Sequence, residues 1–305
     1  MLQLIADGLV VGSIVALGAI GVTLTYSILR FANFAHGEFL TWGAYMCSTV
    51  LAGFAGIVGP MQPIGPFSFG WPLIASLAVA ATATAALALA LDRVLFRHLR
   101  RHGSAITLII ASFGAALVLR NLLLFLYGAV PEYYTREIQV AIRLVPRDVL
   151  GGMRITPDQL FVLGLTSLTV TGLHLFLTRT TLGKAMRAAS LNPQLARVSG
   201  IDVDAVIRST WVIGAVLATV AGVFAGLTVQ LRPQLGFDLL LPLFAAAILG
   251  GIGSVYGAVA GGLIVGLAES LSVPLVGAEY RAATAFAVLI AILLVRPTGL
   301  FGENP

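Results

Sequence analysis

The residues best suited to binding a partner lie in a basic connector, residues 178–208, which joins two long apolar runs. Lys184, Arg187 and Leu191 follow one another at intervals of three and four residues, so on a helix they share one face. Basic faces with apolar neighbours bind either charged protein surfaces or lipid headgroups. The connector is therefore a candidate docking surface, for a second protein or for the membrane.

The same connector carries the signals of two short helices joined by a turn. Asn192 suits the N-cap of the second helix, Pro193 its first position, and Gly200 its C-terminal cap. This second helix adds Leu195 and Arg197 to the candidate docking surface. Small residues in the first helix would let a partner approach closely, namely Ala185, Ala188, Ala189 and Ser190.

A second polar group lies where the first two apolar runs meet. Asn33, His36 and Glu38 are set close together there, and Gly37 separates the two ionisable side chains. Polar groups set in long apolar runs are usually functional or bonded to one another. Two interpretations stay open. Asn33 caps the second span and the His/Glu pair lies at its solvated cytoplasmic end, or the three side chains line a gate or a translocation path.

Two further charged residues lie within apolar runs. Arg120 can extend its side chain toward the outer face of the membrane. Glu269 can pair with Arg281 across the following loop, or it can lie at an interface.

The chain that must position these residues has 305 residues, of which 58% are hydrophobic and only 10% charged, and its mean hydropathy is +0.99. Long apolar runs predict membrane-spanning helices, because backbone groups in lipid must form their hydrogen bonds internally. We expect an all-α fold, a polytopic transmembrane bundle of about eight spans, with residues 1–305 in a single domain. The expected spans are Gly8–Leu29, Glu38–Ala55, Trp71–Phe96, Ser104–Tyr127, Gln159–Leu177, Ile207–Leu231, an interrupted run Leu239–Val273, and Tyr280–Val295.

Connector charges predict the orientation of the spans. Basic residues crowd the connector at residues 92–102 and the connector at residues 178–208, so both should be cytoplasmic. The connector at residues 128–158 mixes both signs of charge and fits the outer face.

The last third of the chain allows two paths through the membrane. Glycines interrupt its long apolar run at Gly250, Gly251 and Gly253, followed by Ser254. A single crossing would leave Arg296 outside. A re-entrant half-helix that turns at the glycines would leave Arg296 in the cytoplasm, in agreement with the charge rule, and we favour this path. Non-helical backbone at membrane depth has to be buried in protein or line a cavity, so the broken segment is a candidate part of the translocation path.

Glycines at four-residue spacing predict close helix packing. The partner helix can belong to the same chain or to a second membrane subunit, and the spacing does not decide between them. The stripes are Gly8/Gly12, Gly222/Gly226, Gly253/Gly257/Gly261 and Gly262/Gly266.

Several functions are disfavoured by what the sequence lacks. Gly183-Lys184 is followed by Ala185, so the chain has no phosphate-binding Gly-x-x-x-x-Gly-Lys-Ser/Thr loop and should not bind ATP itself. The four histidines are scattered, which argues against catalytic residues and a metal site. The excess of basic residues lies in connectors, so no nucleic acid partner is expected.

Four strings together resemble the LivH-type permeases of branched-chain amino-acid ABC importers, in the same order along nearly the whole chain. They are Asn33-Phe-Ala-His-Gly-Glu-Phe39 with Trp42-Gly-Ala-Tyr45, the connector from Arg187-Ala-Ala to Val198-Ser-Gly-Ile-Asp202, Ala247-Ile-Leu-Gly-Gly-Ile-Gly-Ser254, and Arg296-Pro-Thr-Gly-Leu-Phe-Gly302.

The resemblance implies a multi-pass permease subunit in the cell inner membrane that forms a path for branched-chain or related amino acids. It implies a second, LivM-type permease, two cytoplasmic ATPase subunits that carry ATP and Mg, and a periplasmic solute-binding protein. This chain would hold no cofactor. The connector would couple the ATPases to the spans, as the Glu-Ala-Ala loop of other ABC permeases does, although Arg187 stands here in place of the glutamate.

Two alternatives remain beside this function. A related importer for urea, amides or other amino acids would have a similar permease, because selectivity in such importers resides largely in the soluble receptor. A stand-alone secondary transporter would need coupling ions or a proton relay within the membrane, and few acidic residues lie within the spans.

Overall fold

The computed structural model describes residues 1–58, 62–135, 139–146 and 152–302, and helices dominate these ranges. Eight helical segments of the described chain are long and apolar enough to cross a membrane, as expected for a polytopic all-α bundle. The helices are α1 (Leu2–Leu29), α2 (His36–Val58), α3 (Trp71–Leu91), α4 (Arg97–His102), α5 (Ala105–Tyr127), α6 (Pro157–Arg179), α7 (Thr181–Leu191), α8 (Pro193–Val198), α9 (Val203–Thr228), α10 (Leu235–Gly250), α11 (Val255–Val276) and α12 (Arg281–Val295). A π-helical stretch, Asp92–Phe96, joins α3 to α4, and a 3-10 turn, Ala278–Tyr280, precedes α12.

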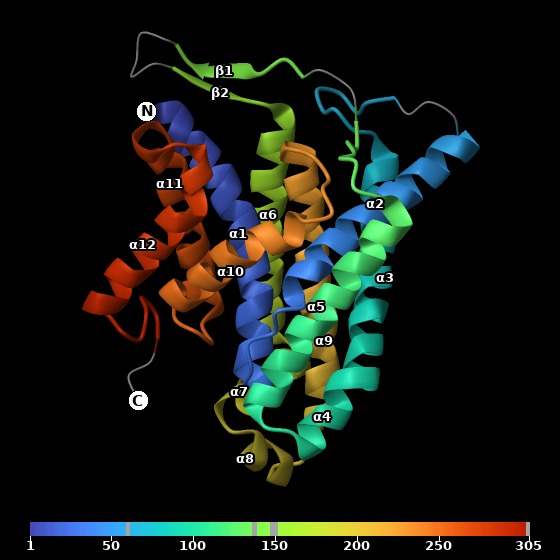
Figure 1. The fold of residues 1–305 in the computed structure, drawn as a ribbon, viewed down its shortest axis with the longest axis vertical. Helices are drawn as coiled ribbons and strands as arrows, with labels where there is room; N and C mark the ends of the chain where they lie inside the picture. Colours follow the sequence, from blue (N-terminus) through green and yellow to red (C-terminus); the bar gives the residue numbers. More distant parts are fainter. Residues whose placement is uncertain (59–61, 136–138, 147–151, 303–305) are drawn as a thin grey trace.

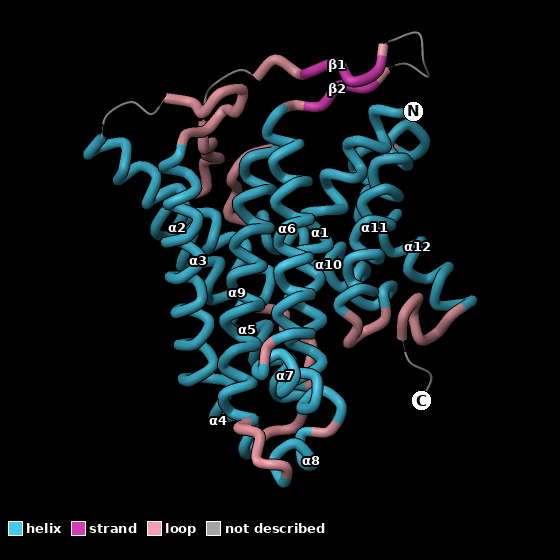
Figure 2. Tube along the Cα trace, turned by 180° about the vertical axis from the view of Figure 1, so that it is seen from behind, coloured by secondary structure: helices cyan, strands magenta, loops and turns pink. Residues whose placement is uncertain are grey.

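Most of the long helices run roughly along the long axis of the molecule (Figure 1). A small antiparallel hairpin of β1 (Ile142–Val145) and β2 (Met153–Ile155) covers one end, near the N-terminus. Helices α7 and α8 form the opposite end, and the view from behind shows the same arrangement (Figure 2). The mixed-charge connector and the basic connector therefore lie at opposite ends. Residues 136–138 and 147–151 of the former are outside the described residues.

Helices α1 and α9 are the most buried spans. Close helix contact explains the glycines of α1, because a Cβ on Gly12 would lie 2.9 Å from the Cα of Leu263 in α11. Gly8, Gly262 and Gly266 lie in the same α1–α11 contact. The Gly8/Gly12 and Gly262/Gly266 stripes therefore pack against a helix of the same chain and not against a second subunit.

Helices α2 and α10 begin inside the bundle, and their first turns touch. A Cβ on Gly37 would collide with the backbone of Gly236, and the reverse holds as well. The backbone N–H of Gly236 donates to the Thr41 hydroxyl at 2.9 Å. Two helix N-termini thus meet at a junction with no room for side chains, which we call the α2–α10 junction.

The glycine-rich interruption falls where the sequence predicts it. Helix α10 ends at Gly250, and Gly251 and Gly253 have φ values of 99° and 103°, which strongly favour glycine. Ser254 then caps α11 by accepting from the backbone N–H of Gly257 at 3.0 Å. The turn places α10 and α11 side by side (Figure 1). Whether α10 is re-entrant in the bilayer stays a prediction.

Candidate functional site

The basic connector forms the two short helices that its sequence predicts. Asn192 caps α8 by accepting from the backbone N–H groups of Gln194 and Leu195, both at 3.0 Å. Pro193 is the first residue of α8, and Gly200 follows the helix with φ 85°. The N–H of Ile201 reaches back to the carbonyl of Ala196 at 3.0 Å, which closes the helix in the manner of a Schellman motif.

One face of α7 is fixed in the bundle and the other is free. Gly183, Met186 and Ala189 are buried at three-residue spacing, and α7 packs on α9 and α1. The predicted face is exposed, with Lys184, Arg187 and Leu191 from α7 together with Leu195, Arg197 and Val198 from α8. This set of six residues is named the α7–α8 surface.

Two of the small residues in α7 that were expected to face a partner are wholly or partly buried within this chain. Ala189 is only 1% exposed, so it packs within this chain and cannot take part in close approach by a partner. Ala188 is partly buried at the edge of the exposed face. The helical period explains the difference, because the buried face of an amphipathic helix must also carry small residues where it crosses a neighbour.

The corner between α6 and α7 is tightly built. The Thr180 hydroxyl donates to the carbonyl of Phe176 at 2.7 Å and accepts from the backbone N–H of Gly183 at 3.0 Å. A Cβ on Gly183 would collide with the backbone of Phe176 and Leu177. Helices α6 and α7 are therefore joined by a tight corner and not by a flexible linker.

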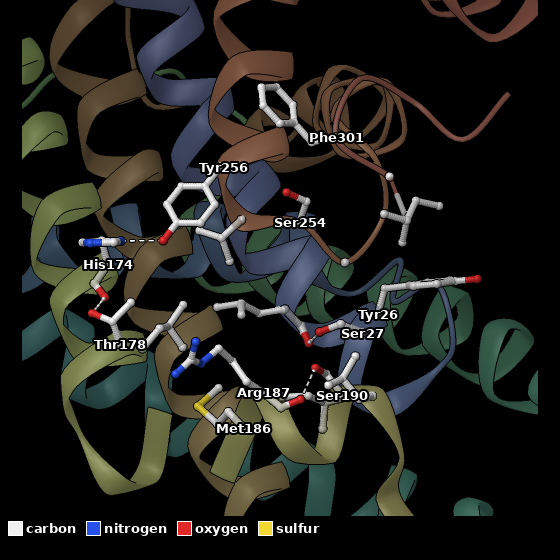
Figure 3. Close-up of a pocket in the computed structure, with 18 of the residues that line it drawn as sticks. Tyr26, Ser27, His174, Thr178, Met186, Arg187, Ser190, Ser254, Tyr256 and Phe301 are labelled. Carbon is white, nitrogen blue, oxygen red and sulfur yellow. Dashed lines mark hydrogen bonds between the residues drawn. The ribbon is translucent and has the colours of Figure 1, made fainter. Parts of the chain in front are cut away.

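A cavity of about 590 Å³ lies between α7, the end of α1, α6 and the glycine-rich turn. Arg187 and Ser190 enter it from α7, and Ser254 and Tyr256 from the turn and α11 (Figure 3). In the sequence analysis the basic connector was a candidate docking surface and the glycine-rich turn a separate candidate for the translocation path. The structure brings them to the same cavity.

Two hydrogen bonds join the elements around this cavity. The Arg30 guanidinium at the end of α1 donates to the carbonyl of Ser190 at 2.5 Å. Across the cavity, the His174 ring of α6 is hydrogen-bonded to the Tyr256 hydroxyl at 2.5 Å (Figure 3). Helix α7 thus has a direct polar link to α1, and α6 has one to α11.

Only part of the glycine-rich turn faces the cavity. Gly253 and Ser254 line it, whereas Gly250 and Gly251 are buried. The carbonyl of Gly250 accepts from the backbone N–H of Phe301 at 3.0 Å, so it is not free to contact a solute. The C-terminal segment folds back onto the turn and forms hydrogen bonds with its backbone. Gly250 and Gly251 were expected to line the translocation path, and the structure instead buries them under this segment.

The residues between α1 and α2 are buried deep in the bundle. Asn33 and His36 are 2% and 1% exposed, and His36 Nε2 lies 3.2 Å from the carbonyl of Gly18 in α1. The interpretation of a solvated end for the His/Glu pair is therefore wrong. Helix α2 starts within the bundle, and its first turn packs on α1 and α10. These residues therefore do not reach water. His36 and Gly37 serve this close packing.

Glu38 has a different role, because it pairs with Arg120. Its Oε1 lies 3.4 Å from Arg120 Nε, and the guanidinium carbon lies 4.0 Å from the ring centre of Phe237 at the start of α10. Arg120 therefore points into the protein and does not extend to the outer face. Glu269 is buried as well, and none of the described residues forms a hydrogen bond with its Oε1. Arg281 acts on its charge without a direct contact within 4.0 Å, so the pair with Arg281 stays a prediction.

The whole length of this bundle matches one known sequence family. Residues 4–294 fit the family described as "Branched-chain amino acid transport system / permease component". The chain belongs to this family of permeases. The permease is thus a multi-pass component of a transport system, and its family is one of transport subunits without an ATPase of their own.

Curated relatives cover the permease almost from end to end. It is 34% identical to the high-affinity branched-chain amino acid transport system permease protein BraD of Pseudomonas aeruginosa, over 99% of this chain and 96% of the relative. It is 36% identical, with the same coverage, to LivH of Escherichia coli strain K12, which has the same description. A probable LivH of Methanocaldococcus jannaschii is 28% identical over 99% of this chain and 93% of its own length. No solved structure matched the permease.

Sequence reasoning missed three contributions to these sites. Arg30 was not among the candidate residues, yet it bonds to α7. The partnership of Glu38 with Arg120 joins residues that lie 82 positions apart. Tyr256 gave no signal at all, because its role depends on His174 in another helix.

Proposed function

We propose that the permease forms the translocation path of an ATP-driven, binding-protein-dependent importer for branched-chain amino acids in the cell inner membrane. It would work as a single permease domain beside a second, LivM-type permease. Two cytoplasmic ATPase subunits would supply the energy, with ATP and Mg bound there, and a periplasmic binding protein would deliver the solute. The names of the relatives support the substrate class.

The observation that carries the proposal is the α7–α8 surface. Helices α7 and α8 lie at one end of the bundle (Figure 2). The buried face of α7 packs on α1 and α9, and the exposed face is basic and apolar. A headgroup-bound helix would place its apolar residues toward the bilayer. Here Leu195 and Val198 belong to α8, which lies beyond the ends of the spans, where an ATPase could receive them.

The contacts of α7 supply a route for coupling. Closure of the ATPases would displace α7, and the Thr180 corner would carry this motion to α6. The bond from Arg30 to Ser190 would carry it to α1, which packs along α11. Because α1, α6 and α11 surround one cavity, the displacement would change the cavity's width. This is the local event that alternating access requires.

Crosslinking tests the docking step. Cys47 is the only cysteine and is fully buried, so Cys47→Ser gives a background for single cysteines. Leu195→Cys should crosslink to an ATPase subunit in membranes that contain the whole complex. Val229→Cys, exposed at the other end of α9, should not. Capture of lipid alone by Leu195→Cys would contradict the proposal.

Reconstitution tests the transport step. The complete complex in proteoliposomes should take up labelled leucine, isoleucine or valine only with ATP and the binding protein. Reversal of charge at Lys184 and Arg197, the two basic residues of the α7–α8 surface that do not line the cavity, should abolish ATPase association while membrane insertion stays normal. Unchanged uptake by this double variant would contradict coupling through the α7–α8 surface. Preferred uptake of urea or amides would move the substrate class and leave the mechanism intact.

A further inference from the structure

The cavity between α7, α6, the end of α1 and the glycine-rich turn is lined by basic residues. Arg30 enters it from the end of α1, Arg187 enters it from α7, and α6 adds His174. No aspartate or glutamate of the described chain lines the cavity. A cleft that carries one sign of charge between apolar walls attracts ions of the opposite sign. The cavity is therefore suited to an anion.

Both arginines have hydrogen-bond donors that are free for a ligand. Arg187 is exposed and turned toward α6 (Figure 3), and within the described chain its guanidinium has no hydrogen bond or ion pair. Arg30 donates from Nη2 to the carbonyl of Ser190, which leaves its other donors. Of the described non-glycine residues, Arg30 alone has a positive φ, 59°. Because glycine adopts this conformation more readily, an arginine at this position indicates a use for its side chain.

The polarity of the lining changes with depth. The cavity lies where α1 and α6 end and α11 begins. Leu24 precedes Arg30 by six positions, so it lies about 9 Å farther into the bundle along α1. Val170 precedes His174 by four positions, which places it about 6 Å farther along α6. The lining is thus basic at the helix ends and apolar farther inside, in the order of headgroup and acyl chain in a phospholipid.

The surroundings of the cavity suit a lipid. Few residues of α6 are buried, and Leu168 and Leu175 are 66% and 49% exposed, so this helix offers an apolar surface to acyl chains. Tyr26 and Tyr256 line the cavity, and tyrosines are enriched where a membrane meets water. The volume of about 590 Å³ lies within the range of roughly 300–1,000 Å³ that is usual for small-ligand sites.

We propose that this cavity binds the phosphate headgroup of an anionic phospholipid from the cytoplasmic leaflet. Arg187 and Arg30 bind the phosphate, and the inner lining, with Leu24 and Val170, contacts the start of an acyl chain. Basic pockets between spans on the cytoplasmic side are the usual sites for anionic headgroups. The bound phosphate joins α7 to the end of α1 and so stabilises the position from which α7 couples to the spans. The cytoplasmic side and the effect on coupling rest on the proposed function.

The charge of the cavity favours a lipid anion over the transported amino acid. A zwitterion also needs an acceptor for its ammonium group, and no acidic residue of the part of the chain that the structure describes lines the cavity. A soluble phosphate would satisfy the arginines but would leave the inner apolar lining in contact with water. Phosphatidylglycerol supplies both the anionic group and the apolar chain.

Native mass spectrometry of the complete importer complex can measure lipid binding without transport. The complex should bind phosphatidylglycerol more tightly than phosphatidylcholine of the same chain length. Arg187→Gln should weaken the binding of phosphatidylglycerol about tenfold, as expected for the loss of one hydrogen bond between charged groups. Arg187→Lys should restore most of it, because lysine also binds phosphate. Arg179→Gln is the matched control, because Arg179 is exposed at the end of α6 and does not line the cavity.

Three results would overturn the site. Equal binding of the two lipids by the wild-type complex would show that the cavity does not select an anion. Unchanged binding by Arg187→Gln, or an equal loss in Arg179→Gln, would show that the anionic lipid binds elsewhere. Competition by glycerol 3-phosphate as strong as that by phosphatidylglycerol would assign the cavity to a soluble anion.

Transport in proteoliposomes tests the effect on coupling. The measured quantity is ATP-dependent leucine uptake with phosphatidylglycerol divided by uptake with phosphatidylcholine alone. This ratio should exceed one for the wild type and Arg179→Gln, and should fall to one for Arg187→Gln. Because each ratio is taken within one variant, a loss of ATPase docking in Arg187→Gln cancels.

The two measurements separate the lipid site from the proposed function. No leucine uptake by the wild-type complex in either lipid would refute the proposed function, whereas selective binding of phosphatidylglycerol would still support the site. Wild-type uptake with a ratio of one would refute the effect of the lipid on coupling.

Discussion

Leu195 offers a quantitative test of the α7–α8 surface. Full burial of a leucine side chain is worth about 1.5–3 kcal/mol. Leu195 is 63% exposed in the chain alone, so burial of this exposed part by a partner is worth about 1–2 kcal/mol. Leu195→Ser should therefore weaken the affinity for the ATPase subunit by about 5-fold to 30-fold. Asn192 still caps α8 in this variant, so the helix should persist.

The assay is titration of the purified ATPase onto the permease complex held in lipid nanodiscs. Val229→Ser is the matched control, because Val229 is 64% exposed but lies at the far end of α9. Its affinity should stay within twofold of wild type. An equally small change for Leu195→Ser would refute the reasoning. Loss of binding to anionic vesicles, with ATPase affinity unchanged, would assign the surface to lipid.

Three further variants test separate parts of the structure. Gly12→Ala should lower stability by about 1–3 kcal/mol because its Cβ meets the backbone of α11, whereas Gly114→Ala, which has open space, should stay near wild type in thermal unfolding in detergent. Asn192→Ala should weaken α8 by about 1 kcal/mol, seen as faster amide exchange in residues 193–198, and Asn192→Asp should restore protection. Arg30→Gln removes the charge-assisted bond to Ser190 and should lower uptake per ATP hydrolysed, whereas an unchanged ratio would contradict coupling through α1.

Local signals in the sequence were sufficient for the connector. The caps of α8 depend on residues within three positions of one another, so Asn192, Pro193 and Gly200 could be placed without tertiary information. The exposed face of α7 followed from helical spacing in the same way. The glycine-rich interruption was also local, because the left-handed backbone at Gly251 and Gly253 strongly favours glycine.

Contacts across the bundle could not be found in this way. Apolar periodicity is weak in a membrane helix, because lipid and protein core are both apolar, so the pattern does not say which face is buried. The start of α2 inside the bundle, the Glu38–Arg120 pair and the link from Arg30 to α7 all depend on tertiary placement. Gly250 was misjudged for the same reason, since its partner Phe301 lies 51 residues away.

The return of the C-terminal segment onto the glycine-rich turn has a practical consequence for protein engineering. The backbone N–H groups of Leu300 and Phe301 donate to the carbonyls of Leu249 and Gly250 at 2.9 and 3.0 Å, and a Cβ on Gly299 would lie 2.7 Å from the backbone nitrogen of Gly251. An affinity tag that replaced these residues would remove the hydrogen bonds that hold the end of α10. Tags should therefore be joined after residue 302 through a flexible spacer.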